Sequence, residues 1–179
     1  LLHDESPVEG VHLYACKKFL SVPVRTPSDM VYGELGRYPL AVNICMKTLK
    51  YWLRIVKMDM ERLPKQAYML LNNLDSQDKI NWVSKVRMTL QTLGFGFIWM
   101  NQGVANKNMF LTVFKQRLVD VVRQEWFAGM RDSERYRLYR EHKSELEPER
   151  YLTDVKIKCF RDTLGRFRLG VSDIQTHKN

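Results

Sequence analysis

The sequence predicts an all-α fold, and three features of the chain indicate that class. Apolar residues recur at spacings of three and four along most of its length, which is the period of an amphipathic helix. Proline stands repeatedly at the start of these segments, and glycine or another turn-forming residue follows them. No stretch keeps the period-two alternation of paired strands. We expect an irregular bundle of roughly eight helices with short connectors.

Helix starts are clearest near the N-terminus. Ser6, followed by Pro7 and by Glu9 three positions on, is predicted to cap the first helix. Thr26 repeats this pattern before a short helix that is expected to end at Gly36. The buried side of the first helix is predicted to consist of its apolar residues at helical spacing: Val8, Val11, Ala15, Phe19 and Leu20.

The strongest helical pattern lies in residues 36–60, where Pro39 fits the first helical position. The apolar residues after it are the predicted core: Leu40, Val42, Ile44, Met46, Leu49, Trp52, Leu53, Ile55 and Val56. Cations stand between them, also at spacings of three and four: Lys47, Lys50, Arg54 and Lys57. The helix therefore has a broad core face and a narrower cationic face. That face fits either solvated surface or a basic patch for nucleic acid.

Further helices are predicted after residue 60. Leu63-Pro64 opens one of them, and Asp78 is expected to cap the next, which covers residues 80–93. Residues 94–99 are predicted to form a tight turn that packs aromatic side chains into a core. The remaining helices are expected at 106–131, after a Ser133 cap, from Pro148, and at 155–170.

The chain has 179 residues, 45% of them hydrophobic, which is enough for a buried core. We expect one helical domain over residues 1–179, and a division into two sub-lobes, 1–103 and 104–179, stays open. Because the first residue is Leu1 and no secretory leader follows, we expect a fragment of a longer polypeptide. No run approaches the ~20 apolar residues of a membrane span, so no membrane partner is expected.

Lysine and arginine outnumber aspartate and glutamate by 29 to 20, which gives a formal net charge of +9. A surplus of this size favours a polyanionic partner, with RNA or DNA ahead of an anionic membrane. The candidate nucleic-acid-binding residues are cations at helical spacing or beside aromatic residues: Arg37, Lys47, Lys50, Arg54, Lys57, Lys115, Arg117, Lys156, Lys158, Arg161, Arg166 and Arg168.

The segment 156–168 combines cations with aromatic residues. Arginine binds phosphates through paired N–H groups, and aromatic rings stack on unpaired bases. We expect Phe160, Leu164 and Phe167 to be core residues, whereas phosphate contact and plain solvation fit the arginines equally well.

The sequence contains no catalytic or metal-binding constellation, so we expect neither an enzyme nor a cofactor. The histidines lack partners at ligand spacing: His3, His12, His142 and His177. Three cysteines far apart, Cys16, Cys45 and Cys159, are expected to be buried free thiols in an intracellular protein. A mixed run is expected to form exposed helical ion pairs: Arg140, Glu141, Lys143, Glu145, Glu147, Glu149 and Arg150.

Several short motifs follow one another in a recognisable order. They are HLYACKKFL (12–20), RTP followed by VYGELGRYPL (25–40), KYWLRIVKM (50–58), NWVSKVR (81–87), GFGFIW (94–99) and FRLGVSDIQTHK (167–178). In order and spacing they resemble the C-terminal part of reverse transcriptases encoded by non-LTR retrotransposons (LINE elements) of animals.

The resemblance implies a region after the polymerase palm, at or beyond the thumb, and before a Cys/His zinc knuckle. The palm motif Tyr-x-Asp-Asp and the knuckle are both missing from this sequence, so no catalytic residue carries over. In that family the parent RNA-directed DNA polymerase nicks target DNA and copies its own RNA onto the exposed end. The region resembled here would help to hold template RNA and target DNA during this target-primed reverse transcription.

The leading hypothesis is therefore a non-catalytic nucleic-acid-binding segment. Its expected partners are RNA or DNA and the remainder of the parent polymerase, without a small-molecule substrate, and its expected locations are the nucleus and the cytoplasm. The alternative is a helical interaction or scaffold domain that packs on the polymerase core or on a host protein. Aromatic residues could supply its anchors, although most are expected to be core: Tyr51, Trp52, Trp82, Trp99 and Trp126.

Overall fold

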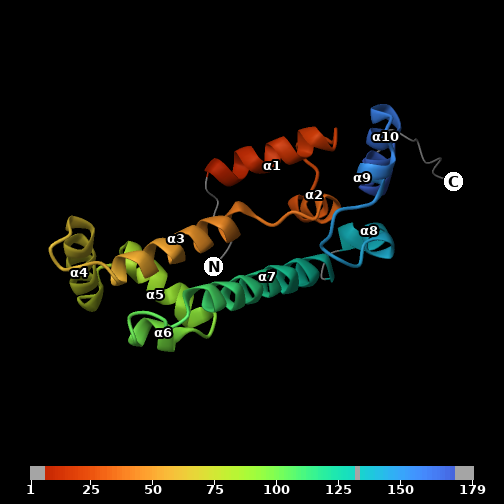
Figure 1. The fold of residues 1–179 in the computed structure, drawn as a ribbon. Coiled ribbons are helices and arrows are strands. Elements are labelled where there is room, and N and C mark those ends of the chain that lie inside the picture. The colour runs from red at the N-terminus through yellow and green to blue at the C-terminus, as the bar shows by residue number, and fades with distance from the viewer. Residues whose placement is uncertain (1–6, 132–133, 172–179) are drawn as a thin grey trace. The chain divides into compact units, whose positions relative to one another are not determined.

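The computed structural model describes residues 7–131 and 134–171, and within these ranges every regular element is a helix (Figure 1). The predicted all-α class is confirmed. The elements in chain order are α1 (Pro7–Phe19), α2 (Ser28–Leu35), α3 (Leu40–Val56), α4 (Leu63–Ser76), α5 (Trp82–Thr92), α6 (Gly96–Met100), α7 (Lys107–Arg131), the 3-10 turn η1 (Glu134–Tyr136), α8 (Arg137–His142), α9 (Tyr151–Asp154) and α10 (Lys158–Arg168). The predicted caps Ser6 and Ser133 lie outside the described residues.

The described chain forms two compact units. Unit 1 consists of residues 41–120, and unit 2 consists of the described residues of 7–40 and 121–171. Helix α7 supplies residues to both units. The division at residue 103 that the sequence left open falls inside unit 1. Because unit 2 joins two segments that are far apart in sequence, no single cut of the chain separates the units.

The core of unit 1 is built around the predicted stripe of α3. Its most buried member, Trp52, donates its indole N–H to Tyr68 Oη at 3.3 Å, and its ring stacks on Trp99 with centroids 5.6 Å apart. The hydroxyl of Tyr68 donates in turn to Gln102 Oε1 at 2.5 Å. Five of the nine predicted core residues are buried, and Ile44 is the one that is exposed. Satisfied polar groups on the two aromatic residues allow them to be buried.

The two connections that flank α5 differ from the prediction. Asn81, not Asp78, caps α5: its Oδ1 accepts from the Val83 N–H at 2.8 Å, while its own N–H donates to Ser84 Oγ at 2.9 Å. Asp78 has a positive φ of 59° and belongs to the preceding turn. After α5, the predicted tight turn is short, because Gly94 takes φ 83° and Gly96 already begins helix α6. The prediction of a turn over all of residues 94–99 is thus wrong.

Gly36 ends α2 as predicted, with φ 58°. The following N–H, that of Arg37, donates to the Tyr32 carbonyl at 3.0 Å, which closes the helix end. A Cβ on Gly36 would lie 2.2 Å from the backbone nitrogen of Pro148. Both the backbone conformation and the close approach therefore require glycine here.

The N-termini of α2 and α3 are held differently from the prediction. Thr26 makes no capping bond; its side chain is buried and its Oγ1 has no hydrogen-bond partner among the described residues. Helix α3 begins one residue after Pro39, and the N–H of Leu40 donates to Glu9 Oε2 at 2.7 Å. The cap of α3 thus comes from a distant helix, which no local pattern could indicate.

Helix α1 packs through a face other than the predicted one. Leu20, just beyond its end, is buried as expected, but Val8, Val11 and Phe19 are exposed. The packed side carries polar groups: Glu9 accepts from the Tyr32 hydroxyl, and Lys17 Nζ donates to the Val24 carbonyl at 2.6 Å. The predicted apolar face was wrong because these polar contacts, and not the apolar stripe, fix the rotation of the helix.

Candidate nucleic-acid interface

Positive charge is concentrated in unit 1. Its residues, 41–120, include twelve lysines and arginines against five aspartates and glutamates, which is a net charge of +7. The rest of the chain accounts for only +2 of the total of +9. Every residue from 41 to 120 is described. The surplus that suggested a polyanionic partner therefore belongs mainly to one compact unit.

The most regular part of this surplus lies on α3. Lys47, Lys50 and Arg54 are exposed and share one side of the helix, as their spacing of three and four requires. Tyr51 lies beside them and is half exposed, with its ring 5.8 Å from that of Trp82. From Lys47 to Arg54 the helix rises about 10.5 Å, since each residue adds ~1.5 Å. That length matches about three phosphates along a stacked strand, at ~3.4 Å each.

These cations are not neutralised by neighbouring acids. Within residues 41–120, the one ion pair joins Arg87 to Asp75, with Arg87 Nε 2.7 Å from Asp75 Oδ2 and Nη2 2.9 Å from Oδ1. Hydrogen bonding to Arg87 lowers the pKa of Asp75. The other predicted site residues of unit 1 are all exposed: Lys57 after α3, and Lys115 and Arg117 on α7. Six candidate cations of unit 1 thus keep their charge for a ligand.

The candidate cations of unit 2 are more heavily engaged. Lys158 pairs with Asp162, and both contact the hydroxyl of Ser21. Arg166 Nε donates to the Ser21 carbonyl at 2.8 Å, and Lys156 Nζ donates to the Thr153 carbonyl at 2.8 Å. Arg161 is half-buried, and Arg37, in the link between α2 and α3, is exposed.

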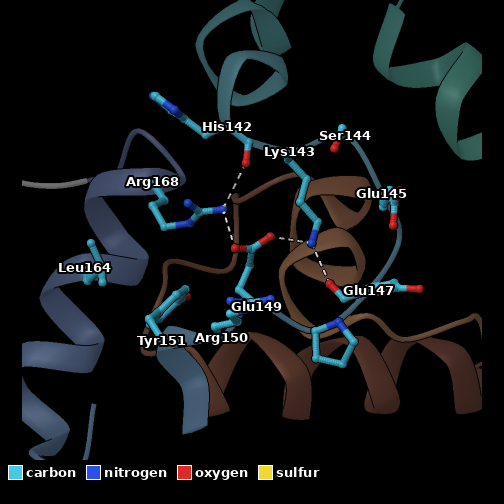
Figure 2. A pocket seen from close by; sticks show the side chains of 11 residues that line it. His142, Lys143, Ser144, Glu145, Glu147, Glu149, Arg150, Tyr151, Leu164 and Arg168 are labelled. Carbon is cyan, nitrogen blue, oxygen red and sulfur yellow. Dashed lines mark hydrogen bonds and ion pairs between the residues drawn. The ribbon is translucent and has the colours of Figure 1, made fainter. Parts of the chain in front are cut away.

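Arg168 belongs to a buried ion-pair network. Its Nε donates to Glu34 Oε1 at 2.6 Å, and its Nη2 lies 3.0 Å from Glu149 Oε2. Glu149 Oε1 also accepts from Lys143 Nζ at 2.5 Å (Figure 2). The Tyr139 hydroxyl completes the site by donating to Glu34 Oε2 at 3.0 Å, and burial together with the Glu34 carboxylate raises the pKa of Tyr139. These contacts join α2, α8, α10 and the loop before α9, so Arg168 is not available to bind a phosphate.

This network corrects a prediction about the run 140–150. Exposed helical ion pairs were expected there, but Lys143 is buried and lies after the end of α8. Its ammonium also donates to the Glu147 carbonyl at 2.5 Å (Figure 2). The partners are residues of a loop, so helical spacing does not describe them.

A hollow of about 380 Å³ lies beside the network (Figure 2). It is lined mainly by the loop and by α10: His142, Lys143, Ser144, Glu145, Glu147, Pro148, Glu149, Arg150, Tyr151, Leu164 and Arg168. Lys143 and Arg168 already face carboxylates, so they have no charge left to offer a bound anion. In the described ranges no three His, Cys, Asp or Glu side chains gather as a metal site would require. The hollow does not suggest a reaction.

Side chains on α10 contradict two further predictions. Phe160, Leu164 and Phe167, expected in the core, are exposed, and so is Cys159. Cys16 is buried as predicted, and Cys45 is half-buried. The sequence carries one signal that was missed: Lys158, Asp162 and Gly165 share the side of the helix opposite to the aromatic residues. A helix side that carries an ion pair and a glycine can pack closely against the backbone of another segment.

Comparison with protein-family models, with curated proteins and with solved structures gives no match. The resemblance to non-LTR reverse transcriptases therefore stays an expectation from the sequence. In the part of the chain that is described, no helix is both long enough and apolar enough to span a bilayer.

Proposed function

We propose that the chain is a non-catalytic nucleic-acid-binding segment whose unit 1 holds a phosphate backbone. The observation that supports this most is the net charge of +7 on residues 41–120, where a single ion pair neutralises one cation. The exposed row of Lys47, Lys50 and Arg54 supplies cations at a spacing suited to successive phosphates. The motif order supports a more specific role, in which the segment helps a retrotransposon reverse transcriptase to hold template RNA or target DNA.

The test is binding of the whole chain to RNA and to DNA over a series of salt concentrations. Replacing Lys47, Lys50 and Arg54 together by glutamine removes three cations from the proposed interface. In a plot of log K against log salt concentration, each phosphate contact contributes about −0.7 to −0.9 to the slope. The slope of the triple variant should therefore be shallower than that of the wild type by roughly 2 to 2.7. A wild-type chain that fails to bind at low salt, or binds without salt dependence, would refute the proposal.

A matched control removes the same charge elsewhere. Lys18, Arg131 and Arg137 are exposed and belong to unit 2, and their replacement by glutamine lowers the net charge by the same amount. If the control weakens binding as much as the triple variant, net charge alone accounts for the affinity and the α3 face is not the interface.

The alternative function is protein interaction, and one feature of α1 favours it. Val8, Val11 and Phe19 form an exposed apolar side of that helix, which is typical of a surface that packs on another protein. The tryptophans do not add anchors to it, since Trp52 and Trp126 are buried and Trp82 and Trp99 are half-buried. This function would be favoured if the wild type binds no nucleic acid and either self-associates or is poorly soluble. The substitutions Val11→Ser and Phe19→Ser should then reduce the self-association or restore the solubility.

A further inference from the structure

Helix α10 presents an apolar stripe to solvent. Ile157, just before the helix, Phe160, Leu164 and Phe167 follow one another at spacings of three, four and three, so they lie on one side. Phe160 is 63% exposed and Phe167 is 59% exposed, although each carries a large apolar ring. Exposed aromatic residues in a row of this kind mark a binding surface more often than chance exposure does.

The orientation of the stripe is fixed by the opposite side of the helix. On that side Asp162 accepts a hydrogen bond from Ser21 Oγ at 2.8 Å, and at the edge of the stripe, one turn after Leu164, Arg168 pairs with buried Glu34. Between them Gly165 is buried so closely that a Cβ there would lie 2.9 Å from Tyr151 Oη. The helix therefore packs through its polar side, and turning the aromatic residues inward would break the Ser21–Asp162 hydrogen bond and the Arg168–Glu34 ion pair.

Charge around the stripe is positive. Lys156 and Arg161 flank it, while the one acid of α10, Asp162, lies on the packed side and is paired with Lys158. Arg166 also lies on the packed side, where it donates to the Ser21 carbonyl. A surface of flat apolar rings with cationic edges complements a chain of flat apolar bases on an anionic backbone. A protein partner would need an apolar groove with an acidic rim, which is a more special requirement.

We propose that the outer side of α10 binds unpaired bases of a single-stranded nucleic acid, with Phe160 and Phe167 as stacking platforms. The rings are seven residues apart, about 10.5 Å along the helix, which is about three nucleotides of a stacked strand. A duplex keeps its bases stacked on each other, so it cannot offer them to these rings. This inference rests on the proposed function, because the single strand is taken to be the same kind of ligand that unit 1 holds by its phosphates.

The experiment compares three fluorescent probes with the whole chain: a strand of about 12 thymidines, the same strand with abasic sugars, and a duplex of equal length. The variant is Phe160→Ala with Phe167→Ala. Its control is Phe97→Ala with Phe127→Ala, which removes two other exposed rings, Phe97 being 59% exposed as Phe167 is. All four rings are exposed, so the fold should survive, and circular dichroism checks that it does.

The α10 variant should bind the thymidine strand about 5- to 150-fold more weakly for each ring lost. Binding of the duplex and of the abasic strand should not change, and the control variant should bind all probes like the wild type. Unchanged affinity of the α10 variant for the thymidine strand would overturn the inference. An equal loss for all three probes would also overturn it, because stacking acts on bases only.

Failure of the proposed function gives a different result. In that case the wild type binds none of the probes at low salt, and both proposals fall together. If the wild type binds the duplex and the thymidine strand alike, with steep salt dependence, phosphate binding stands and only the stacking inference is refuted.

Discussion

Removal of the guanidinium of Arg168 is expected to destabilise unit 2 strongly. Glu34 is 0% exposed, and Arg168 Nε lies 2.6 Å from its carboxylate. Replacement of Arg168 by methionine keeps an unbranched stem but leaves that carboxylate with a hydroxyl donor, Tyr139, and no counter-charge. Loss of one partner of a buried ion pair costs about 3 to 5 kcal/mol.

The assay is thermal and urea unfolding followed by far-ultraviolet circular dichroism. For a chain of this size each kcal/mol lowers Tm by about 2 to 4 °C, so the variant should melt roughly 6 to 20 °C below the wild type. If the two units unfold in separate transitions, only the transition of unit 2 should move. A loss below about 1 kcal/mol would show that the network does not hold the helices together, and the reasoning would fail.

Two further variants distinguish the loss of the buried ion pair from the loss of an exposed arginine. Arg166 is exposed and gives one hydrogen bond to the Ser21 carbonyl, so Arg166→Met should cost about 1 kcal/mol at most. Glu34→Gln combined with Arg168→Met removes both charges. The double variant should be more stable than Arg168→Met alone, because no uncompensated charge is then buried.

Three other predictions concern Gly36, the ion pair between Arg87 and Asp75, and the cysteines. Gly36→Ala should lower the free energy of unfolding by more than about 1 kcal/mol in urea, because φ is 58° and a Cβ would meet Pro148 at 2.2 Å. Because Arg87 lowers the pKa of Asp75, the stability that this pair adds is present above the unfolded pKa of ~3.9 and is lost as pH falls through the lower folded pKa. Arg87→Met should therefore flatten the acid side of a plot of urea midpoint against pH, and exposed Lys85→Met should not. Iodoacetamide at about pH 8 should label exposed Cys159 first, as read by mass spectrometry, since burial raises the pKa of Cys45 to about 11 and also raises that of Cys16. Faster labelling of Cys45 would contradict this prediction.

Much of the helical framework could be predicted because it depends on local rules. Apolar periodicity with Pro64 at its start locates α4, and Gly36 ends α2 through a conformation that glycine favours. The side of a helix that packs was predictable only where apolar residues decide it, as they do around Trp52 in α3.

The faces of α1 and α10 could not be read from the sequence in the same way. Both helices pack through polar side chains whose partners are far away in the chain: Glu9 with Tyr32, and Arg168 with Glu34, 134 residues apart. A periodic pattern reports which side of a helix is apolar and says nothing of a distant ion pair that can outweigh it. Here hydrogen bonds of α1 and an ion pair of α10 to distant residues leave the apolar sides exposed.

Part of the candidate site could be predicted, because helical spacing shows which cations share one side of a helix. The cations of α3 at spacings of three and four were expected to form an exposed face, and Lys47, Lys50 and Arg54 are exposed. The concentration of charge in unit 1 was not predictable, because the boundary of that unit cuts through α7 and depends on contacts between distant segments. The engagement of Arg168 was missed because helix spacing identifies a cation without identifying its partner.

Lysine footprinting can show whether unit 1 contacts the nucleic acid. The whole chain is acetylated briefly with and without a saturating single strand, and the modification of each lysine is read by mass spectrometry. If unit 1 holds the phosphate backbone, Lys47, Lys50 and Lys57 should be strongly protected, and Lys18 of α1, also exposed, should be modified equally in both samples. Protection of Lys18 to the same degree, or no protection on α3, would contradict the claim that unit 1 holds the phosphate backbone.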